Sequence, residues 1–163
     1  MARVLMPLHW IFGLVYQAAV FVTSLRVTVV GWSMYPTLKA GEYVLFNRLA
    51  YLRSGPKRGD VIMVRRLLEG KKAEIKRVVG VHGDTVKLGR GILTVNDIQF
   101  GEASSLEGQS VWILKEDECF LLGDVMDMST DSRSFGPVAQ EAIKARAWLV
   151  CWPLSHWRSL HEE

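Results

Sequence analysis

The residues best suited to chemistry in this sequence are a serine and a lysine, Ser33 and Lys76. Ser33 lies in the turn-like segment 31–38, where a serine is ordinarily just a hydrogen-bonded turn residue. A serine that attacks a carbonyl must lose its proton, and the four histidines are too dispersed along the chain to suggest a Ser-His pair. A neutral lysine amine can accept that proton, so Lys76 is the candidate general base.

Burial would supply the neutral amine that this chemistry requires. Lysine has a reference pKa near ~10.4, and desolvation lowers it because the charged form loses its water. Lys76 lies in the apolar run 75–79, where strand alternation sends Lys76 and Arg77 to opposite faces. The pattern therefore predicts that Lys76 points inward while Arg77 meets solvent or an acid.

Composition and charge exclude several classes of protein. The 163 residues are 49% hydrophobic and 23% charged, which is typical of one folded domain and not of a disordered chain. The net charge of +3 is scattered among acidic residues, so we expect no nucleic-acid partner, and a mildly basic exterior suits anionic lipid. Cys119 and Cys151 lack metal-ligand spacing, so no metal and no cofactor are expected. Both cysteines are interpreted as buried strand residues, with a single disulfide as the open alternative.

The first 25 residues predict a membrane anchor, followed by one catalytic domain over residues 26–163. No charged residue occurs from Val4 to Leu25, and a helix of that length would run ~33 Å, close to the hydrocarbon thickness of a bilayer. A cleaved secretory signal is the alternative, but no Ala-x-Ala-type site ends the apolar run. Basic residues flank the run on both sides, so charge does not set the orientation, and an outside catalytic domain is permitted.

After residue 25 the sequence changes to short β-branched runs separated by turn residues, at a spacing of about eight to twelve residues. This pattern predicts a mainly β body, built as a coiled sheet or a barrel. Segments 85–88 and 92–95 flank Gly89-Arg90-Gly91 and predict a hairpin. The one soluble helix expected is short, from Ala139 to Ile143. Further strands are expected at 27–30, 43–46, 61–64, 111–114, 120–122 and 147–152.

Four ordered motifs of this sequence resemble those of the type I signal peptidase family. They are Ser33-Met34-Tyr35-Pro36-Thr37-Leu38, then 59–62, then 76–84, and finally Gly123-Asp124 together with 129–138. The similarity runs from about residue 31 to 153 and implies the coiled β-sheet fold of that family behind one transmembrane helix. It also implies a membrane-bound serine endopeptidase that removes signal peptides, with Ser33 as the nucleophile and Lys76 as the general base.

The same resemblance implies roles for five supporting residues. Ser129 would orient the lysine amine, and Asp131 and Arg133 would hold the wall of the active site together. Asp124 would pair with Arg77. The alternative for the four charged residues is a surface ion-pair network, which contributes little.

The resemblance also implies how the substrate would be held. The oxyanion hole would use the Ser33 amide and the backbone at Gly31, where family members often carry a serine. The substrate would add as an extended strand beside residues 27–32, with small side chains just before the cut. The expected pocket walls, which are otherwise interpreted as plain core residues, are Val29, Met34 and Ile75.

The expected partners are preproteins and a lipid bilayer, with the catalytic domain on the outer face of a single-pass protein. The short body resembles compact bacterial members and also mitochondrial inner-membrane peptidase subunits. A bacterial plasma membrane is favoured, and a mitochondrial inner membrane, with a partner subunit, is the alternative. Two other functions stay open: a related Ser-Lys maturation peptidase with a dedicated substrate, and a silent, membrane-tethered module that binds peptides. Loss of Ser33 or Lys76 would indicate the silent module, and both residues are present.

Overall fold

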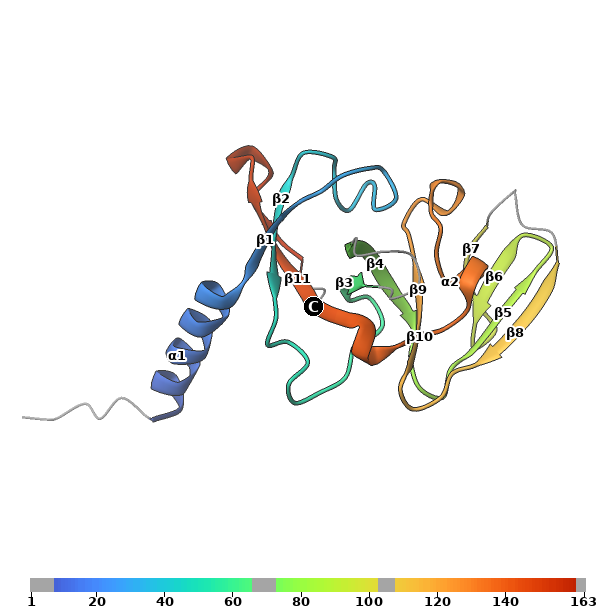
Figure 1. The fold of residues 1–163 in the computed structure, drawn as a ribbon, viewed down its shortest axis with the longest axis horizontal. Coiled ribbons are helices and arrows are strands. Elements are labelled where there is room, and N and C mark those ends of the chain that lie inside the picture. The colour runs from blue at the N-terminus through green and yellow to red at the C-terminus, as the bar shows by residue number, and fades with distance from the viewer. Residues whose placement is uncertain (1–7, 66–72, 103–107, 161–163) are drawn as a thin grey trace, which may run out of the picture.

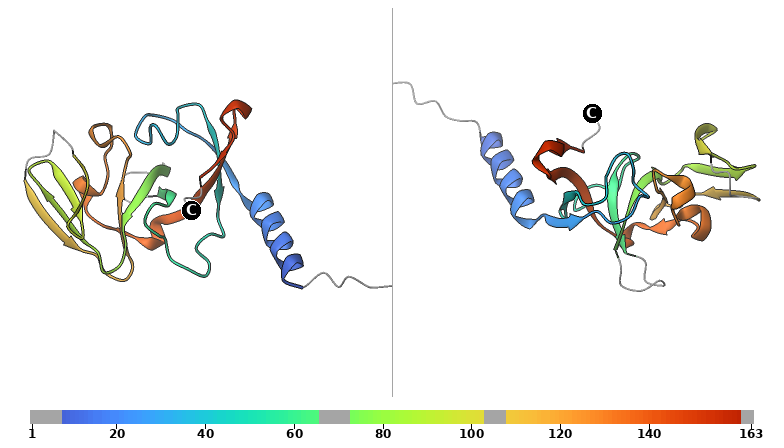
Figure 2. Two further views of the ribbon diagram at one scale, coloured as in Figure 1. Left: turned by 180° about the vertical axis from the view of Figure 1, so that it is seen from behind. Right: turned by 90° about the horizontal axis from the view of Figure 1, so that it is seen from above.

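An N-terminal helix and two antiparallel sheets make up the computed structural model, which describes residues 8–65, 73–102 and 108–160. Helix α1 (Leu8–Thr23) projects from one end of the β body, as Figures 1 and 2 show. Its last turn is closed by the hydroxyls of Thr23 and Ser24, which donate to the carbonyls of Ala19 and Val20 at 2.7 Å and 2.6 Å. The main chain then turns directly into the first strand.

The helix within the anchor expected over residues 1–25 ends at Thr23. Leu25 is the first residue of a strand, because it pairs with Phe46 of the neighbouring strand instead of continuing the helix. Helix α1 has 16 residues, and residues 1–7 of the expected anchor lie outside the described chain. Within residues 8–65, 73–102 and 108–160, no helix combines the length and apolar character needed to cross a membrane.

The larger sheet runs through the centre of the molecule and carries Ile75, Lys76 and Arg77. Its strand order is β1-β2-β11-β3-β4-β9-β10, with β12 paired to β11. Its strands are β1 (Leu25–Thr28), β2 (Tyr43–Asn47), β3 (Val61–Arg65), β4 (Ala73–Gly80), β9 (Glu118–Leu122), β10 (Val138–Ala139), β11 (Ile143–Trp152) and β12 (Arg158–Ser159). The ten-residue β11 pairs with both β2 and β3, and shifts of register let it bend between them. The sheet is open, with β1 and β10 at its edges, so the barrel alternative is wrong for the described strands.

A smaller sheet lies at the end of the body opposite α1 (Figure 1). Its order is β7-β6-β5-β8, formed by β5 (Thr85–Gly89), β6 (Ile92–Val95), β7 (Ile98–Glu102) and β8 (Gln109–Ile113). The predicted β5–β6 hairpin is confirmed, with Arg90 and Gly91 as a two-residue loop. Both loop residues have positive φ, 53° and 78°, because a tight turn of this hand matches the twist of the flanking strands. Trp112 packs on Phe120 of β9, with ring centroids 5.0 Å apart, and joins the two sheets.

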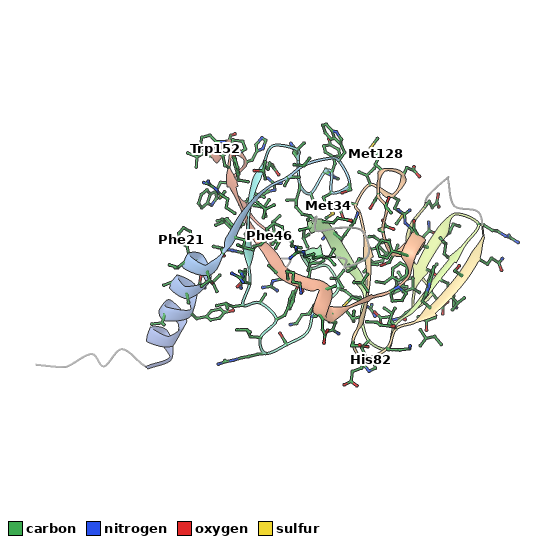
Figure 3. All side chains as sticks on the ribbon, viewed as in Figure 1. Phe21, Met34, Phe46, His82, Met128 and Trp152 are labelled. Atoms are coloured by element: carbon green, nitrogen blue, oxygen red, sulfur yellow. The ribbon has the colours of Figure 1, made fainter. Side chains whose placement is uncertain are left out.

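One of three hydrophobic clusters lies beneath the segment that contains Ser33. Alternate residues of β2, Val44 and Phe46, are fully buried in it, as the period of two along a strand requires. Met34 and Leu38 from the 31–38 segment insert into the same cluster. Figure 3 shows Met34 and Phe46 inside the body. The segment between β1 and β2 is therefore anchored to the core by the buried side chains of Met34 and Leu38.

The helix expected from Ala139 to Ile143 is wrong. Val138 and Ala139 form β10, residues Gln140–Ala142 make a single 3₁₀ turn (η2), and Ile143 begins β11. The turn is too short to bury an apolar helix face, and Ile143 pairs with Val64 instead. The other short helices are α2 (Ser132–Phe135), η1 (Met126–Met128) and η3 (Leu154–His156).

Candidate active site

The serine that the sequence singled out lies on a turn between β1 and β2. Gly31 opens the turn with φ of 89°, a value that favours glycine because side chains crowd the backbone there. The Tyr35 amide donates to the Trp32 carbonyl at 3.0 Å, and the Leu38 amide donates to the Met34 carbonyl at 2.7 Å. Ser33 itself is half-buried. Local hydrogen bonds and the buried Met34 and Leu38 together fix its backbone.

Lys76 comes from the middle of β4 and is 4% exposed. Its Nζ donates to the Ser129 hydroxyl at 2.8 Å and lies 3.5 Å from a carboxylate oxygen of Glu74. The neighbouring Arg77 turns to other partners, so the predicted separation of the two basic side chains is confirmed. The described hydrogen bond of the amine therefore goes to Ser129, in the geometry expected of a residue that orients it.

Gly123 is the point where the two serines meet. A methyl group placed on Gly123 would lie 2.4 Å from Ser129 Oγ and 2.8 Å from the Ser33 carbonyl oxygen. The Val125 amide also donates to the Ser33 carbonyl at 3.0 Å. Since Ser129 Oγ accepts from Lys76, this packing brings Lys76, Ser129 and Ser33 together from three separate parts of the chain. Only a residue without a side chain allows so close an approach.

Asp131 and Arg133 form a buried pair that shapes the loop carrying Ser129. The Arg133 guanidinium donates to both Asp131 carboxylate oxygens, at 2.7 Å and 2.9 Å, and to the carbonyls of Met126 and Ser129, at 2.6 Å and 3.3 Å. Asp131 also accepts from the Gly123 amide at 3.0 Å. Their side chains are 0% and 3% exposed, so the surface-network alternative does not fit this pair.

The predicted pairing of Arg77 with Asp124 is present. Arg77 donates from Nε and Nη2 to the two oxygens of Asp124, at 2.8 Å and 3.0 Å. Its guanidinium also donates to the Gly59 carbonyl and to the Thr37 hydroxyl, each at 2.9 Å. A planar fork suits this arrangement because it engages a carboxylate with two parallel bonds. Arg77 thus joins β4 to the loop after β9 and to the Ser33 segment.

The three expected pocket residues lie together beneath the Ser33 turn. Val29 and Met34 are buried in the first hydrophobic cluster, and Ile75 packs partly buried against it. Ile75 is the direct neighbour of Lys76 on β4. The cluster brings these side chains to the floor of the site, and whether a substrate touches them stays a prediction.

Sequence reasoning missed a group of residues that hold the Ser33 segment from its far end. Glu42 and Arg158 pair across 116 positions of sequence, and Arg158 reaches the carbonyl of Thr37. Thr37 was quoted only as part of a motif, and no local pattern marks Glu42 or Arg158, because the contact joins distant segments.

The remaining titratable candidates lie elsewhere. His82 is exposed at an edge of the body away from Met34 and Met128 (Figure 3). Cys119 and Cys151 are free thiols, so the disulfide alternative is wrong. Among the described residues, no group of three or more His, Cys, Asp or Glu side chains is arranged to hold a metal ion.

A buried lysine that donates to Ser129, with Ser129 and the Ser33 main chain packed on one glycine, is an arrangement typical of candidate serine hydrolases. Residues 1–152 match the family model described as "Signal peptidase, peptidase S26". The chain therefore belongs to this family and is a serine endopeptidase.

Relatives of known name occur in organelles and in bacteria. The chain is 31% identical to "Mitochondrial inner membrane protease subunit 1" of Schizosaccharomyces pombe, over 98% of this chain and 92% of that protein. It is 32% identical to "Mitochondrial ATP-independent inner membrane protease subunit 1b" of Arabidopsis thaliana, over 76% and 67%. It is 28% identical to "Signal peptidase IB" of Staphylococcus aureus, over 80% and 79%. A crystal structure of a signal peptidase I from Enterococcus faecalis has a TM-score of 0.45 at 25% identity, covering 56% of this chain and 95% of that one.

Proposed function

We propose that this protein is a signal peptidase that cleaves preproteins with Ser33 as nucleophile and Lys76 as general base. The observation that carries the proposal is the buried Lys76 amine, 2.8 Å from Ser129 Oγ, beside the glycine on which Ser129 and Ser33 both pack. Only the neutral amine of a lysine can accept a proton, and burial in general disfavours the charged form because that form loses its water. The family of the chain supports the same assignment.

The proposed reaction has two halves that share one base. Lys76 Nζ takes the Ser33 hydroxyl proton as Oγ attacks the scissile carbonyl, and the oxygen of that carbonyl becomes an oxyanion. The Ser33 amide and the backbone at Gly31 would stabilise that oxyanion. The protonated amine then gives its proton to the leaving amine nitrogen as the peptide bond breaks. Water, deprotonated by the same lysine, hydrolyses the acyl-enzyme and restores Ser33.

The supporting residues act on the position of the base. Ser129 accepts from the Lys76 amine and limits its rotation, and the Asp131–Arg133 pair fixes the loop that carries Ser129. The carboxylate of Glu74 also lies 3.5 Å from the same amine. Contacts between nucleophile and base often tighten only in the substrate complex.

The substrate would approach along the open edge of the larger sheet. β1 is the edge strand there, and it pairs with β2 alone among the described strands. An extended preprotein segment could form backbone hydrogen bonds beside residues 27–32, leading its scissile bond to Ser33. Small residues before the cut would fit against Val29, Met34 and Ile75, which pack together in one hydrophobic cluster.

The named relatives support a membrane location for this activity. We propose a single-pass protein, with residues 1–25 as the anchor region and residues 26–163 as the catalytic domain on the outer face. A bacterial plasma membrane is our first choice. The match to a mitochondrial inner membrane protease subunit over 98% of the chain favours a second candidate, a maturation peptidase with a dedicated substrate and a partner subunit.

The test is cleavage of a preprotein by the detergent-solubilised protein, with the new N-terminus of the product determined by mass. Ser33→Ala and Lys76→Ala should each abolish cleavage, because a two-part catalytic unit fails when either part is lost. Ser134→Ala and Lys87→Ala, which change exposed residues outside the proposed site, should cleave normally. A Lys76→Ala protein that kept more than about a tenth of wild-type turnover, less than ~1.4 kcal/mol of barrier, would exclude lysine as the base.

A further inference from the structure

Thr37, near the end of the Ser33 turn, is held by two arginines from distant strands. Arg77 of β4 donates from Nη2 to the Thr37 hydroxyl at 2.9 Å. Arg158 of β12 donates from Nη2 to the Thr37 carbonyl at 2.5 Å. The side chain and the main chain of Thr37 therefore accept hydrogen bonds from two different arginines. The second of them, Arg158, lies on β12, the last described strand.

Each of these arginines is itself fixed by a carboxylate. Arg77 forms its fork with Asp124. Arg158 forms a second fork with Glu42, donating from Nη1 and Nη2 to the two carboxylate oxygens at 2.9 Å and 3.0 Å. Arg77 forms its fork with Nε and Nη2, whereas Arg158 uses Nη1 and Nη2, and both arginines also donate to Thr37.

Glu42 is the more deeply buried member of the second fork, at 1% exposed. Besides Arg158, it contacts His156 Nδ1 at 2.9 Å and accepts from the Lys39 amide at 2.9 Å. Burial raises the pKa of Glu42, but the hydrogen bonds from Arg158 and the Lys39 amide, with the charge of Arg158, outweigh it and lower the pKa overall. Glu42 is therefore an anion that closes residues 39–42 onto the C-terminal segment.

The first fork leads directly to the catalytic groups. Arg77 follows Lys76 on β4, and Asp124 lies between Gly123, on which Ser129 packs, and Val125, whose amide holds the Ser33 carbonyl. A displacement of Thr37 would therefore change the distance between the Ser33 turn and the strand of its base. Without the pair of Arg158 and Glu42, Thr37 would be held by Arg77 but not by Arg158.

We propose that Arg158 and Glu42 are positioning residues for the Ser33 nucleophile. They set the turn against β4 through Thr37 and touch neither substrate nor base. This inference rests on the proposed function, because it assumes that Ser33 attacks the substrate. It assigns a catalytic consequence to the C-terminal segment, which none of the sequence motifs includes.

Arg158→Lys is the decisive variant. Lysine keeps the positive charge but has no planar fork, so it cannot bond both Glu42 oxygens and the Thr37 carbonyl together. A misplaced catalytic group can lose ~10²-fold in rate for a shift of about 1 Å, so we expect kcat to fall at least ~10-fold. KM should change less than about twofold, and the acid limb of the pH–rate profile should stay in place, since the contacts of Lys76 are unchanged.

The pair of Arg58 and Asp84, which does not contact Thr37 in any described hydrogen bond, provides a matched control. Arg58 donates from Nε to Asp84 at 2.7 Å, with side chains 44% and 7% exposed, against 34% and 1% for Arg158 and Glu42. Arg58→Lys should lower the melting temperature about as much as Arg158→Lys while leaving kcat within about twofold of wild type. A purely structural role for Arg158 would give both variants the same profile.

The experiment uses the full-length, detergent-solubilised protein and one preprotein, with Ser33→Ala as the reference for complete loss. A folded Arg158→Lys protein with wild-type kcat would overturn the inference, and so would a fall in kcat matched by Arg58→Lys. If Arg158→Lys fails to fold, Glu42→Gln decides by the same criteria, because it keeps the side-chain volume and removes the charge. An active Ser33→Ala protein would instead refute the proposed function.

Discussion

Gly123→Ala should disable the site without disturbing most of the fold. Gly123 is buried, and its φ lies outside the left-handed region, so the backbone itself accepts alanine. The new methyl group would meet Ser129 Oγ at 2.4 Å, Ser129 Cβ at 2.5 Å and the Ser33 carbonyl oxygen at 2.8 Å. The collision thus falls on the main chain of Ser33, the proposed nucleophile, and on Ser129, the residue proposed to orient its base.

The size of the effect follows from these distances. Ordinary contact for a Cβ begins at 3.4 Å, so Ser129 Oγ must retreat by ~1 Å and the Ser33 carbonyl by rather more than half as much. A shift of about 1 Å in a catalytic group costs ~10²-fold in rate, which is ~2.7 kcal/mol of barrier. We therefore expect kcat to fall ~10²-fold, with a much smaller change in KM.

The assay is preprotein cleavage with kcat and KM measured separately, alongside thermal melting of each variant. Gly89→Ala is the neutral control, since its Cβ would meet nothing nearer than Gln109 Cγ at 3.8 Å. Gly80→Ala is the strained control, because its Cβ would meet Leu114 Cδ1 at 2.8 Å in the second cluster, away from the serines. Normal kcat in a folded Gly123→Ala protein, or equal losses of kcat in Gly80→Ala, would refute this reasoning.

Four further results are expected. Burial raises the pKa of the Cys119 thiol to about 12, so a thiol reagent at neutral pH should modify Cys151 and leave Cys119 unmodified until the protein unfolds; equal rates by mass spectrometry would contradict this. Burial raises the pKa of Asp84, but hydrogen bonds and the charge of Arg58 outweigh it and hold that pKa below the usual value, so stability from this carboxylate is present above ~4 and is lost as pH falls below it. The difference in melting temperature between wild type and Asp84→Asn should accordingly shrink on acidification, and a constant difference would be evidence against the pair. Turnover should rise with pH as the base loses its proton, and His82→Ala should keep that acid limb; its loss would make histidine the base. Preproteins with Ala before the scissile bond should be cut faster than those with Leu or Phe, and equal rates would show that the Ser33 site does not select small residues.

The sequence by itself was enough to predict a mainly β body and to propose the chemistry. Types and order were enough to propose Ser33 and Lys76, since a serine without a histidine partner needs another base. Alternation along 75–79 predicted that the side chains of Lys76 and Arg77 lie on opposite faces of the strand. In the structure Lys76 is buried and Arg77 donates to Asp124. These features depend on local period and residue type, which a sequence displays directly.

Local sequence patterns predicted the ends of helices and strands less well than their types. Leu25 extends the apolar run, yet it pairs in β1, because the hydroxyls of Thr23 and Ser24 close the helix just before it. The helix predicted over 139–143 does not form, and Ile143 pairs with Val64 instead. Backbone pairing with a distant strand outweighed local propensity at both places.

Only the tertiary structure decided how the proposed dyad is assembled. The approach of Ser33 and Ser129 across Gly123 depends on the loop after β9 returning to the turn after β1. Thr37 accepts hydrogen bonds from Arg77 and Arg158, which lie 40 and 121 positions away from it in the sequence. No periodicity encodes such contacts, because they arise only when the folded sheets bring separate segments together. Charge-assisted hydrogen bonds from the two arginines then hold these segments in place.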